Sequence, residues 1–178
     1  MATETEYERT YLARCLPDEI RGIDSVVIRD VYIPETVAHA HLRLRQKGDA
    51  FVMTKKVPIR DSDSSAMYEH TIELDRAEYD ALIATSNRVL QKRRYNVLID
   101  GYEAEVDVYE GGLKGLVTID FEFASAVDKD SFAADSHALL ADVTQEEFIA
   151  AGYLSGKSYD DIAGELEKYG YERINEEL

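Results

Sequence analysis

The chain contains no tryptophan, one cysteine and three prolines among its 178 residues. A single cysteine, Cys15, excludes an intramolecular disulfide and suits a reducing compartment, where we expect it to be a small buried apolar side chain. No apolar run approaches the roughly 20 residues that a membrane-spanning helix needs. The first residues, Met-Ala-Thr-Glu-Thr-Glu, lack the basic and then apolar pattern of a signal peptide. These absences predict a cytoplasmic protein with no membrane partner.

Acidic residues outnumber basic ones by 36 to 20, which gives a formal net charge of −16. Such a charge opposes sequence-independent binding of DNA or RNA, because the phosphates of nucleic acids are repelled at long range. It does not exclude a phosphorylated ligand, since a local cluster of Lys and Arg side chains in a cavity dominates at short range. We therefore expect a small-molecule ligand, no nucleic-acid partner, and either a monomer or a homodimer.

Alternating and β-branched stretches predict eight strands, separated by short turn signals such as Asp100-Gly101. The predicted strands are 4–12, 25–33, 39–46, 50–57, 67–74, 88–98, 102–109 and 115–124. The polar stretch 60–65 is expected to be a loop. Short hairpin connections between so many strands favour an antiparallel sheet that closes on itself.

Helical patterns interrupt and follow the strands. Asp75 and Glu78 form a predicted capping box for a helix over 76–84. Thr144 is expected to cap a helix over 145–151, and Ser158 one over 159–168. The chain thus reads as a mostly β, α+β protein with a single domain over 1–178. Its barrel strands and one inserted helix fill 1–125, and C-terminal helices fill 126–178.

Like charges recur two residues apart along the predicted strands, with apolar residues between them. The pairs are Glu6 and Glu8, Arg43 and Arg45, Lys92 and Arg94, Glu105 and Asp107, and Asp120 and Glu122, with Glu69 and Glu73 as a looser case. Residues i and i+2 of a strand point to the same face, so each strand has one charged and one apolar face. In a closed barrel, the charged faces would line the lumen and the apolar faces would lie under helices.

A second interpretation, in which the paired charges are structural and bind no ligand, remains open at this point. Charged alternate positions are common on the solvated face of an ordinary antiparallel sheet, and opposite charges on neighbouring strands can form ion-pair ladders. A charged lumen, in contrast, is suited to binding metal ions and a polyanion together. His39 and His41 share the face of Arg43 and Arg45, where they are either structural or in contact with a phosphate.

The order of these motifs resembles the CYTH superfamily, the triphosphate tunnel metalloenzymes. Glu6-Tyr-Glu8-Arg9-Thr10 resembles the family's ExExK signature, and His41-Leu-Arg43-Leu-Arg45 resembles its second block. The later blocks are similar to Met53-Thr-Lys55-Lys56, Lys92-Arg-Arg94, Glu105-Val-Asp107-Val-Tyr109-Glu-Gly and Ile119-Asp120-Phe-Glu122-Phe123. The resemblance runs from about residue 4 to residue 124.

The resemblance implies an eight-stranded tunnel with a charged lumen that grips a triphosphate and holds Mg²⁺ or Mn²⁺. The leading hypothesis is a metal-dependent hydrolase of small triphosphates, cleaving inorganic tripolyphosphate to pyrophosphate and phosphate. The alternatives are a class IV-type adenylyl cyclase and a non-catalytic module that binds triphosphate or polyphosphate.

By the same resemblance, each charged group has an expected role. The phosphate-binding residues would be Arg43, Arg45, Lys56, Lys92 and Arg94. The metal ligands would be Glu6, Glu8, Asp120 and Glu122, the catalytic residues Glu6, Glu8, Lys56 and Glu69, and the supporting acidic shell Glu105 and Asp107. A second metal ion could hold the attacking water.

The chain also departs from the family pattern. Thr10 stands where the signature has lysine, and Arg9 cannot replace that lysine because strand parity turns it outward. Met67 and Thr71 replace an expected arginine and a second glutamate. We considered whether Lys157, near the start of a predicted tail helix, supplies the missing cation at the tunnel mouth. Glu146 and Glu147 are expected to be solvated surface residues.

Overall fold

The computed structural model describes residues 4–60 and 63–175, within which nine strands and four α-helices are found. The strands are β1 (Glu4–Ala13), β2 (Val26–Ile33), β3 (Leu42–Lys47), β4 (Ala50–Arg60), β5 (Asp63–Leu74), β6 (Val89–Ile99), β7 (Tyr102–Tyr109), β8 (Val117–Phe123) and β9 (Leu139–Asp142). The helices are α1 (Arg76–Ile83), α2 (Ala126–Asp130), α3 (Ala151–Leu154) and α4 (Ala163–Glu167), with 3-10 turns η1 (Asp18–Ile20), η2 (Gly111–Leu113), η3 (Glu147–Ile149) and η4 (Tyr159–Asp161). Within these residues, no helix has the length and apolar character needed to cross a membrane.

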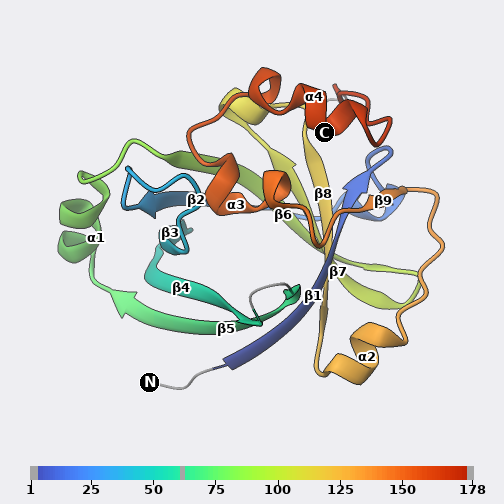
Figure 1. Ribbon diagram of the computed structural model, residues 1–178, viewed down its shortest axis with the longest axis horizontal. Coiled ribbons are helices and arrows are strands. Elements are labelled where there is room, and N and C mark those ends of the chain that lie inside the picture. The colour runs from blue at the N-terminus through green and yellow to red at the C-terminus, as the bar shows by residue number, and fades with distance from the viewer. Residues whose placement is uncertain (1–3, 61–62, 176–178) are drawn as a thin grey trace.

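Eight of the strands close into an antiparallel barrel, as the sequence predicts. The order of hydrogen-bonded neighbours is β5-β4-β3-β2-β6-β7-β8-β1-β9, and a further pairing of β1 with β5 closes the ring (Figure 1). Strand β1 makes this closure possible because its two halves have different partners. Residues 4–7 pair with β5, and residues 7–12 pair with β8.

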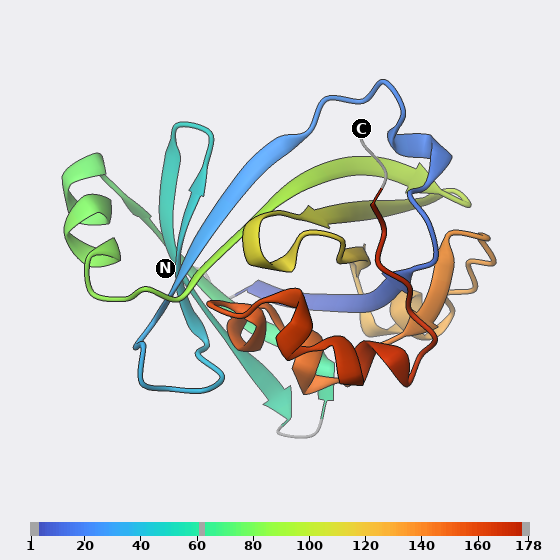
Figure 2. The ribbon, with the colours of Figure 1, turned by 90° about the horizontal axis from the view of Figure 1, so that it is seen from above.

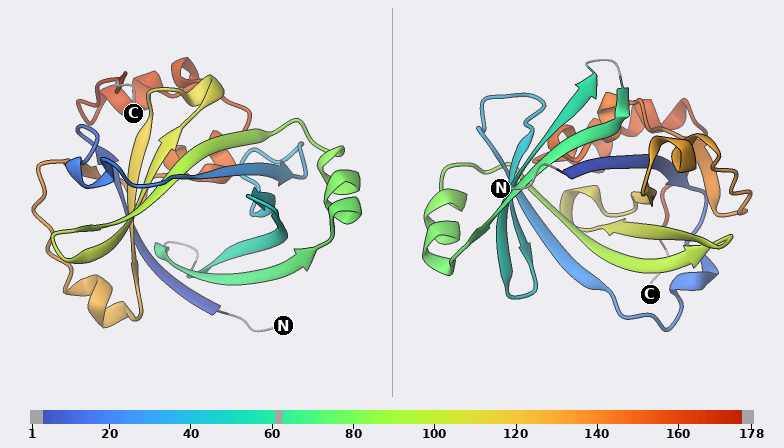
Figure 3. Two further views of the ribbon diagram at one scale, coloured as in Figure 1. Left: turned by 180° about the vertical axis from the view of Figure 1, so that it is seen from behind. Right: turned by 90° about the horizontal axis from the view of Figure 1, so that it is seen from below.

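The apolar faces of the strands lie outside the barrel, where other elements cover much of them, although Val27, Tyr68 and Ile72 remain exposed. Ile119 and Phe121 of β8 are fully buried, and Phe132, which follows α2, packs on Phe121 at a ring-centroid distance of 4.6 Å. Elsewhere, Tyr79 of α1 packs in a cluster with Val31 and Leu44. Figure 3 shows α1 and α2 at opposite ends of the barrel. The alternation in the sequence therefore places the apolar faces outward, beneath the segments that pack on them, as predicted.

One end of the barrel is filled by the C-terminal tail. On the lumen side of four adjacent strands, the charged residues give way to Leu12, Leu90, Tyr109 and Leu116, all of which are buried. They form one apolar cluster with tail residues that include Phe148, Leu154, Ile162, Leu166 and Tyr171. Figure 2 shows the tail helices lying along one side of the molecule, beside β1. The tail thus supplies a large part of the core, which motif spacing did not predict.

Two local expectations are wrong. The stretch 60–65 is not simply a loop, because β4 continues to Arg60 and β5 begins at Asp63, which pairs with Arg60; residues 61–62 lie outside the described part. Backbone pairing in a hairpin does not require apolar side chains, so polarity alone was a poor guide. An additional strand, β9, pairs with the end of β1 in a stretch where no strand was predicted.

The predicted tail helices form only in part. No helix is capped by Thr144, because its hydroxyl donates to Asp142 Oδ1 at 2.5 Å and accepts the Thr10 N–H at 3.1 Å. The stretch 145–151 is divided into η3 and the beginning of α3. The second tail prediction fares better, since Ser158 and Asp161 do form a capping box. That segment is nevertheless broken at Ile162, between η4 and α4.

The capping box of α1 gives a direct test of this part of the fold. Asp75 Oδ1 accepts the Glu78 N–H at 2.8 Å, and Glu78 Oε2 accepts the Asp75 N–H at 2.9 Å. Replacing Asp75 by Ala should lower the free energy of unfolding by about 1 kcal/mol, measured by urea denaturation. Asp75→Asn is the matched control, because asparagine caps about as well. Equal losses for both variants would contradict the capping role.

Candidate active site

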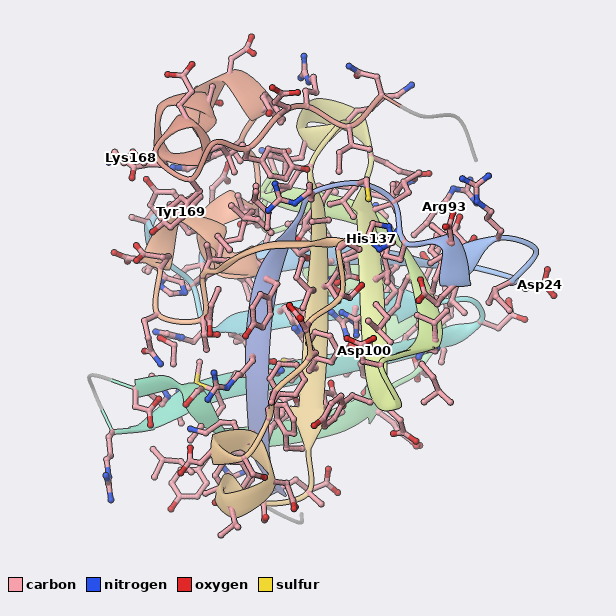
Figure 4. The ribbon with its side chains drawn as sticks, turned by 90° about the vertical axis from the view of Figure 1, so that its right-hand side faces the viewer. Asp24, Arg93, Asp100, His137, Lys168 and Tyr169 are labelled. Carbon is pink, nitrogen blue, oxygen red and sulfur yellow. The ribbon has the colours of Figure 1, made fainter. Side chains whose placement is uncertain are left out.

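A cavity of about 1160 Å³ occupies the barrel lumen, and the predicted site residues line it. The lining includes Glu6, Glu8, Arg43, Arg45, Lys56, Glu69, Lys92, Arg94, Glu105, Asp120 and Glu122. Asp107 is the exception, since it is fully buried beneath Lys92 and Arg94. Glu73 does not line the cavity, so the looser pair with Glu69 contributes only one member. Arg93, labelled in Figure 4, faces outward and pairs with Glu110 at 2.7 Å.

The two signs of charge are segregated around the barrel. Three strands, β4, β3 and β6, carry the basic arc, which comprises Lys56, Arg43, Arg45, Lys92 and Arg94, and β2, which lies between β3 and β6, contributes the buried Asp30. The other four, β7, β8, β1 and β5, carry the acidic arc, which comprises Glu105, Asp120, Glu122, Glu6, Glu8 and Glu69. Cross-strand ion pairs occur chiefly where the arcs meet, at Lys56 with Glu69 and Arg94 with Asp107. The ion-pair ladder is thus limited to particular places rather than extending around the barrel.

Asp107 holds two cations of the basic arc in place. It accepts hydrogen bonds from Lys92 Nζ and, at 2.8 and 2.7 Å, from Arg94 Nε and Nη2. Burial alone would raise the pKa of Asp107, but the charges of Lys92 and Arg94 outweigh it and bring the pKa to about 2. Burial lowers the pKa of the Lys92 ammonium despite this partner. Asp107 therefore supports the basic side chains from below.

Asp30 plays the same part on β2 and was missed in the sequence. It is fully buried and accepts two hydrogen bonds of 2.8 Å from Arg45 Nε and Nη2. Burial works to raise the pKa of Asp30, yet the hydrogen bonds and charge of Arg45 leave it below its ordinary value. Asp30 has no charged residue two positions away, so the pattern of paired charges did not reveal it. It does share a strand face with Ile28 and Tyr32, which could have placed it in the lumen.

Arg43 and Lys56 are less completely paired. Lys56 Nζ contacts Glu6 and lies 3.4 Å from Glu69 Oε2, while Arg43 Nη2 lies 3.9 Å from the same Glu69 atom. Arg43 Nε is buried without a hydrogen-bond partner among the described residues. A buried donor of this kind costs roughly 1 to 3 kcal/mol if it stays unpaired. Arg43 as a residue lines the cavity, so other parts of its guanidinium can meet an oxygen-rich ligand there.

Carboxylates face carboxylates across the strands of the acidic arc. Glu8 is directly opposite Glu122, and Glu105 is directly opposite Asp120. Side chains in such positions have Cβ atoms roughly 4.5 to 5.5 Å apart, and like charges there are destabilising. Burial, followed by the neighbouring carboxylates, raises the pKa of Asp120 and of Glu122 to about 7. The pKa of Glu8 is also raised, chiefly by burial.

The chemistry of these donors fits a hard divalent cation. Oxygen ligands of this kind suit Mg²⁺ or Mn²⁺, and a bound cation would relieve the repulsion between the facing carboxylates. Within residues 4–60 and 63–175, no three His, Cys, Asp or Glu side chains form a ready-made coordination group. Mg²⁺ does not require one, because it usually keeps several waters and binds one or two carboxylates together with substrate phosphates.

The positions that depart from the family pattern can also be located. Thr10 lines the cavity opposite Asp120, and Arg9 points outward to Asp142, at 3.5 Å, as parity predicted. The idea that Lys157 replaces the missing lysine is wrong for this structure. Its Nζ lies 3.3 Å from the centroid of the Tyr153 ring, and it does not line the cavity.

Several cavity residues had little or no signal in the sequence. Glu4 and Glu103 extend the acidic arc, and Lys47 extends the row of β3. Further strand residues, such as Tyr32 and Thr54, also line the cavity, and segments outside the barrel strands contribute His39, Ala40, His41 and the tail residues 144–147 and 149–152. Glu146 and Glu147 are exposed as expected, yet they also line the cavity edge. Strand alternation can identify lumen residues, but it says nothing about which part of the tail folds back over them.

The structure thus defines a class of protein, a closed antiparallel barrel whose lumen carries an acidic and a basic arc. The CYTH domain family model matches residues 4–148, so the chain belongs to the CYTH domain family. An inorganic triphosphatase of Nitrosomonas europaea is 32% identical over 123 residues, which cover 68% of this chain and 78% of that protein.

Solved structures show the same architecture. The crystal structure of an inorganic triphosphatase has a TM-score of 0.60 and 28% identity, covering 87% of this chain and 95% of that one. A putative adenylate cyclase from Bacillus halodurans has a TM-score of 0.55 at 18% identity, covering 100% of this chain and 96% of that one. At that identity, the second likeness shows the fold alone.

Asp107 provides the stability test for the site. Asp107→Asn leaves Lys92 and Arg94 buried without their common counter-ion, so the free energy of unfolding should fall by roughly 3 to 5 kcal/mol. Glu105→Gln is the control, because the Glu105 side chain is partly solvated and its pairing with Arg94 should be worth less than about 1 kcal/mol.

The cost of the Asp107 substitution should also depend on pH. The folded pKa of about 2 lies below the unfolded value of about 3.9. The stability contributed by Asp107 is therefore fully present above about pH 4 to 5 and is lost as the pH falls toward 2. Denaturant titrations from pH 6 to pH 2.5 should show the difference between wild type and Asp107→Asn shrinking. A difference that stays constant would contradict the buried ion-pair assignment.

Proposed function

We propose that this chain is a metal-dependent hydrolase of small triphosphates, which cleaves inorganic tripolyphosphate to pyrophosphate and phosphate. The observation that carries the proposal is the division of one lumen into a basic and an acidic arc. A polyanion can lie against the basic arc while divalent cations occupy the space between its phosphates and the acidic arc. The similarity to inorganic triphosphatases supports this reading.

The basic arc has the groups that a chain of phosphates requires. Arg45 and Arg94 are already oriented by Asp30 and Asp107, so little further ordering is needed when they meet phosphate oxygens. Arg43 adds a second guanidinium from the neighbouring lumen position on β3. Lys56 and Lys92 add point charges from β4 and β6. We assign these five residues to phosphate binding.

The acidic arc would hold the cation and the attacking water. Glu6, Glu8, Asp120 and Glu122 would be its ligands, and a bound Mg²⁺ or Mn²⁺ would supply charge neutralisation at the phosphates. Glu69, which contacts Lys56 and Arg43, is positioned to orient a water. In the hydrolysis, the water oxygen bonds to the terminal phosphorus, the bridging P–O bond breaks, and pyrophosphate leaves. Lys56 would stabilise the charge that develops on the phosphates.

The activity can be tested with the full chain. Phosphate release from tripolyphosphate should require Mg²⁺ or Mn²⁺, stop when a chelator is added, and exceed release from ATP measured in parallel. Binding by calorimetry without release, from folded protein, would favour the non-catalytic module instead. Thr10 and Met67 are the observations that favour that second candidate, because each lacks an expected cation on the lumen side. Formation of a cyclic product from ATP would identify a cyclase.

The metal ligands can be tested separately from the phosphate-binding residues of the basic arc. Replacing Glu6 and Glu8 together by Gln should reduce metal-dependent turnover by at least about 100-fold, because the amide oxygens bind hard cations less well. Glu73→Gln is the matched control, since Glu73 is an acid of β5 that lies outside the cavity. The free energy of unfolding is measured alongside, so that a folding defect is recognised. Unchanged turnover in the double variant would refute the assignment of these ligands.

A further inference from the structure

The cavity is completed at one edge by two segments that do not belong to the barrel strands. The first is the loop before β3, which contributes His39, Ala40 and His41, and the second is the tail stretch 144–152. Neither belongs to a barrel strand, although one end of each is tied to the barrel: the Lys56 N–H donates to the His41 carbonyl at 3.1 Å, and the Thr10 N–H donates to Thr144 Oγ1 at 3.1 Å. The rest of each segment depends on further contacts, and we refer to the two segments, 37–41 and 144–152, as the cavity wall.

Arg88 connects both segments of the cavity wall. Its guanidinium donates to the carbonyl oxygens of Val37 and Ala38 in the first segment, the latter at 2.8 Å. It also donates to the carbonyl oxygen of Gly152 in α3 and, at 3.3 Å, to that of Ser155 just after it. All four acceptors are backbone groups. A planar fork with five N–H donors can reach carbonyls on two sides, which the single ammonium of a lysine cannot.

Arg88 is itself fixed to the barrel. It directly precedes β6, its N–H donates to Ser86 Oγ at 3.1 Å, and its carbonyl accepts the Tyr32 N–H at 2.9 Å. Ser86 Oγ donates in turn to the Tyr32 carbonyl at 2.7 Å. Because Tyr32 lies in β2 and lines the cavity, the wall is tied to a rigid element beside the basic arc.

The two segments of the wall also contact one another closely. Gly152 packs so tightly that a Cβ at this position would overlap the carbonyl oxygen of Ala40. At the cavity edge, His39 Nδ1 lies 3.2 Å from Glu147 Oε1, and the rings of His39 and His41 stand 4.7 Å apart. The junction between the two segments thus depends on two features. Arg88 binds both segments without lining the cavity, and Gly152 has no side chain to separate them.

We propose that Arg88 is a positioning residue, which holds both segments of the cavity wall through four backbone carbonyls and so sets how tightly the cavity binds its ligand. The inference rests on the proposed triphosphate site. Arg88 does not line the cavity and would not touch the substrate. Its loss should therefore weaken binding, while the reacting groups on the strands stay in place.

The experiment compares Arg88→Lys and Arg88→Gln with the matched control Arg93→Lys. Arg93 lies in β6, the strand that Arg88 directly precedes. Its side chain pairs with Glu110 instead of with the cavity wall. For the Arg88 variants, the KM for tripolyphosphate should rise about tenfold while kcat changes by less than about twofold. Backbone amide exchange should accelerate in residues 37–41 and 147–155, and the control should change neither quantity.

A second variant reaches the same junction by a different route. Gly152→Ala should push α3 away from Ala40 and raise KM in the same way. Because Arg88 and Gly152 act on one junction, the combined variant should raise KM little more than the stronger single change. Additive effects on KM would overturn the idea of a common junction.

The outcomes separate this proposal from the proposed function. An Arg88 variant that lowers kcat with KM unchanged, or that leaves amide exchange in the wall unchanged, would overturn the positioning role. A lack of phosphate release by the unmodified chain would overturn the proposed function instead. In that case, amide exchange together with calorimetric binding of tripolyphosphate would still support or overturn the role of Arg88.

Discussion

The closure of the barrel by β1 is the constraint on which the rest of the structure depends. Because β1 pairs with β5 through its first residues and with β8 through its later ones, the sheet has no free edge in between. Closure turns a two-faced sheet into a lumen and an outer surface. Every i, i+2 pair of charges is then directed to one enclosed space, and every apolar face must find a cover outside. Helix α1 and the segment that contains α2 and Phe132 supply those covers, whereas the C-terminal tail fills one end of the lumen.

Charges of both signs in one lumen have unequal support from the fold. Asp30 and Asp107 are buried counter-ions that hold Arg45, Lys92 and Arg94 in place. Within the part of the chain that the structure describes, Glu8 and Glu122 at the centre of the acidic arc have no such ion-pair partner and lie directly opposite each other. A stable protein that keeps facing carboxylates accepts a cost in folding free energy, and a cation bound between them would offset that cost. Among the described residues, the fold therefore supplies buried counter-ions to the basic arc but not to the facing carboxylates Glu8 and Glu122.

Strand alternation was enough to predict most of the site, because a period of two specifies which side chains share a face. It placed Glu6, Arg43 and Asp120 in one lumen without any knowledge of pairing order. It could not predict how the strands are ordered around the barrel, so the segregation into two arcs was not foreseen. Asp30 was missed since it has no charged neighbour two residues away.

The tail was the least predictable part, for a physical reason. Thr144 and Ser158 carry the same kind of helix-start signal, yet of the two only Ser158 forms a capping box. The Thr144 hydroxyl is used instead by Asp142 and by the Thr10 N–H, a contact between residues far apart in the chain. Local propensity is weak compared with such tertiary contacts, and short helices depend on packing for their stability. The segments that Arg88 joins are of this kind, because neither carries a sequence pattern that predicts its place.

The net charge of −16 imposes a further condition on any polyanionic ligand. At distances beyond about 10 Å, the field of the whole chain repels a triphosphate, although salt screens that repulsion. Within the lumen, the basic arc acts at contact distance and in a less polar medium, so its attraction outweighs the distant charges. A triphosphate that carries a divalent cation has less charge to be repelled and brings a counter-ion for the facing carboxylates Glu8 and Glu122. Metal and polyanion are thus expected to bind more strongly together than either does alone.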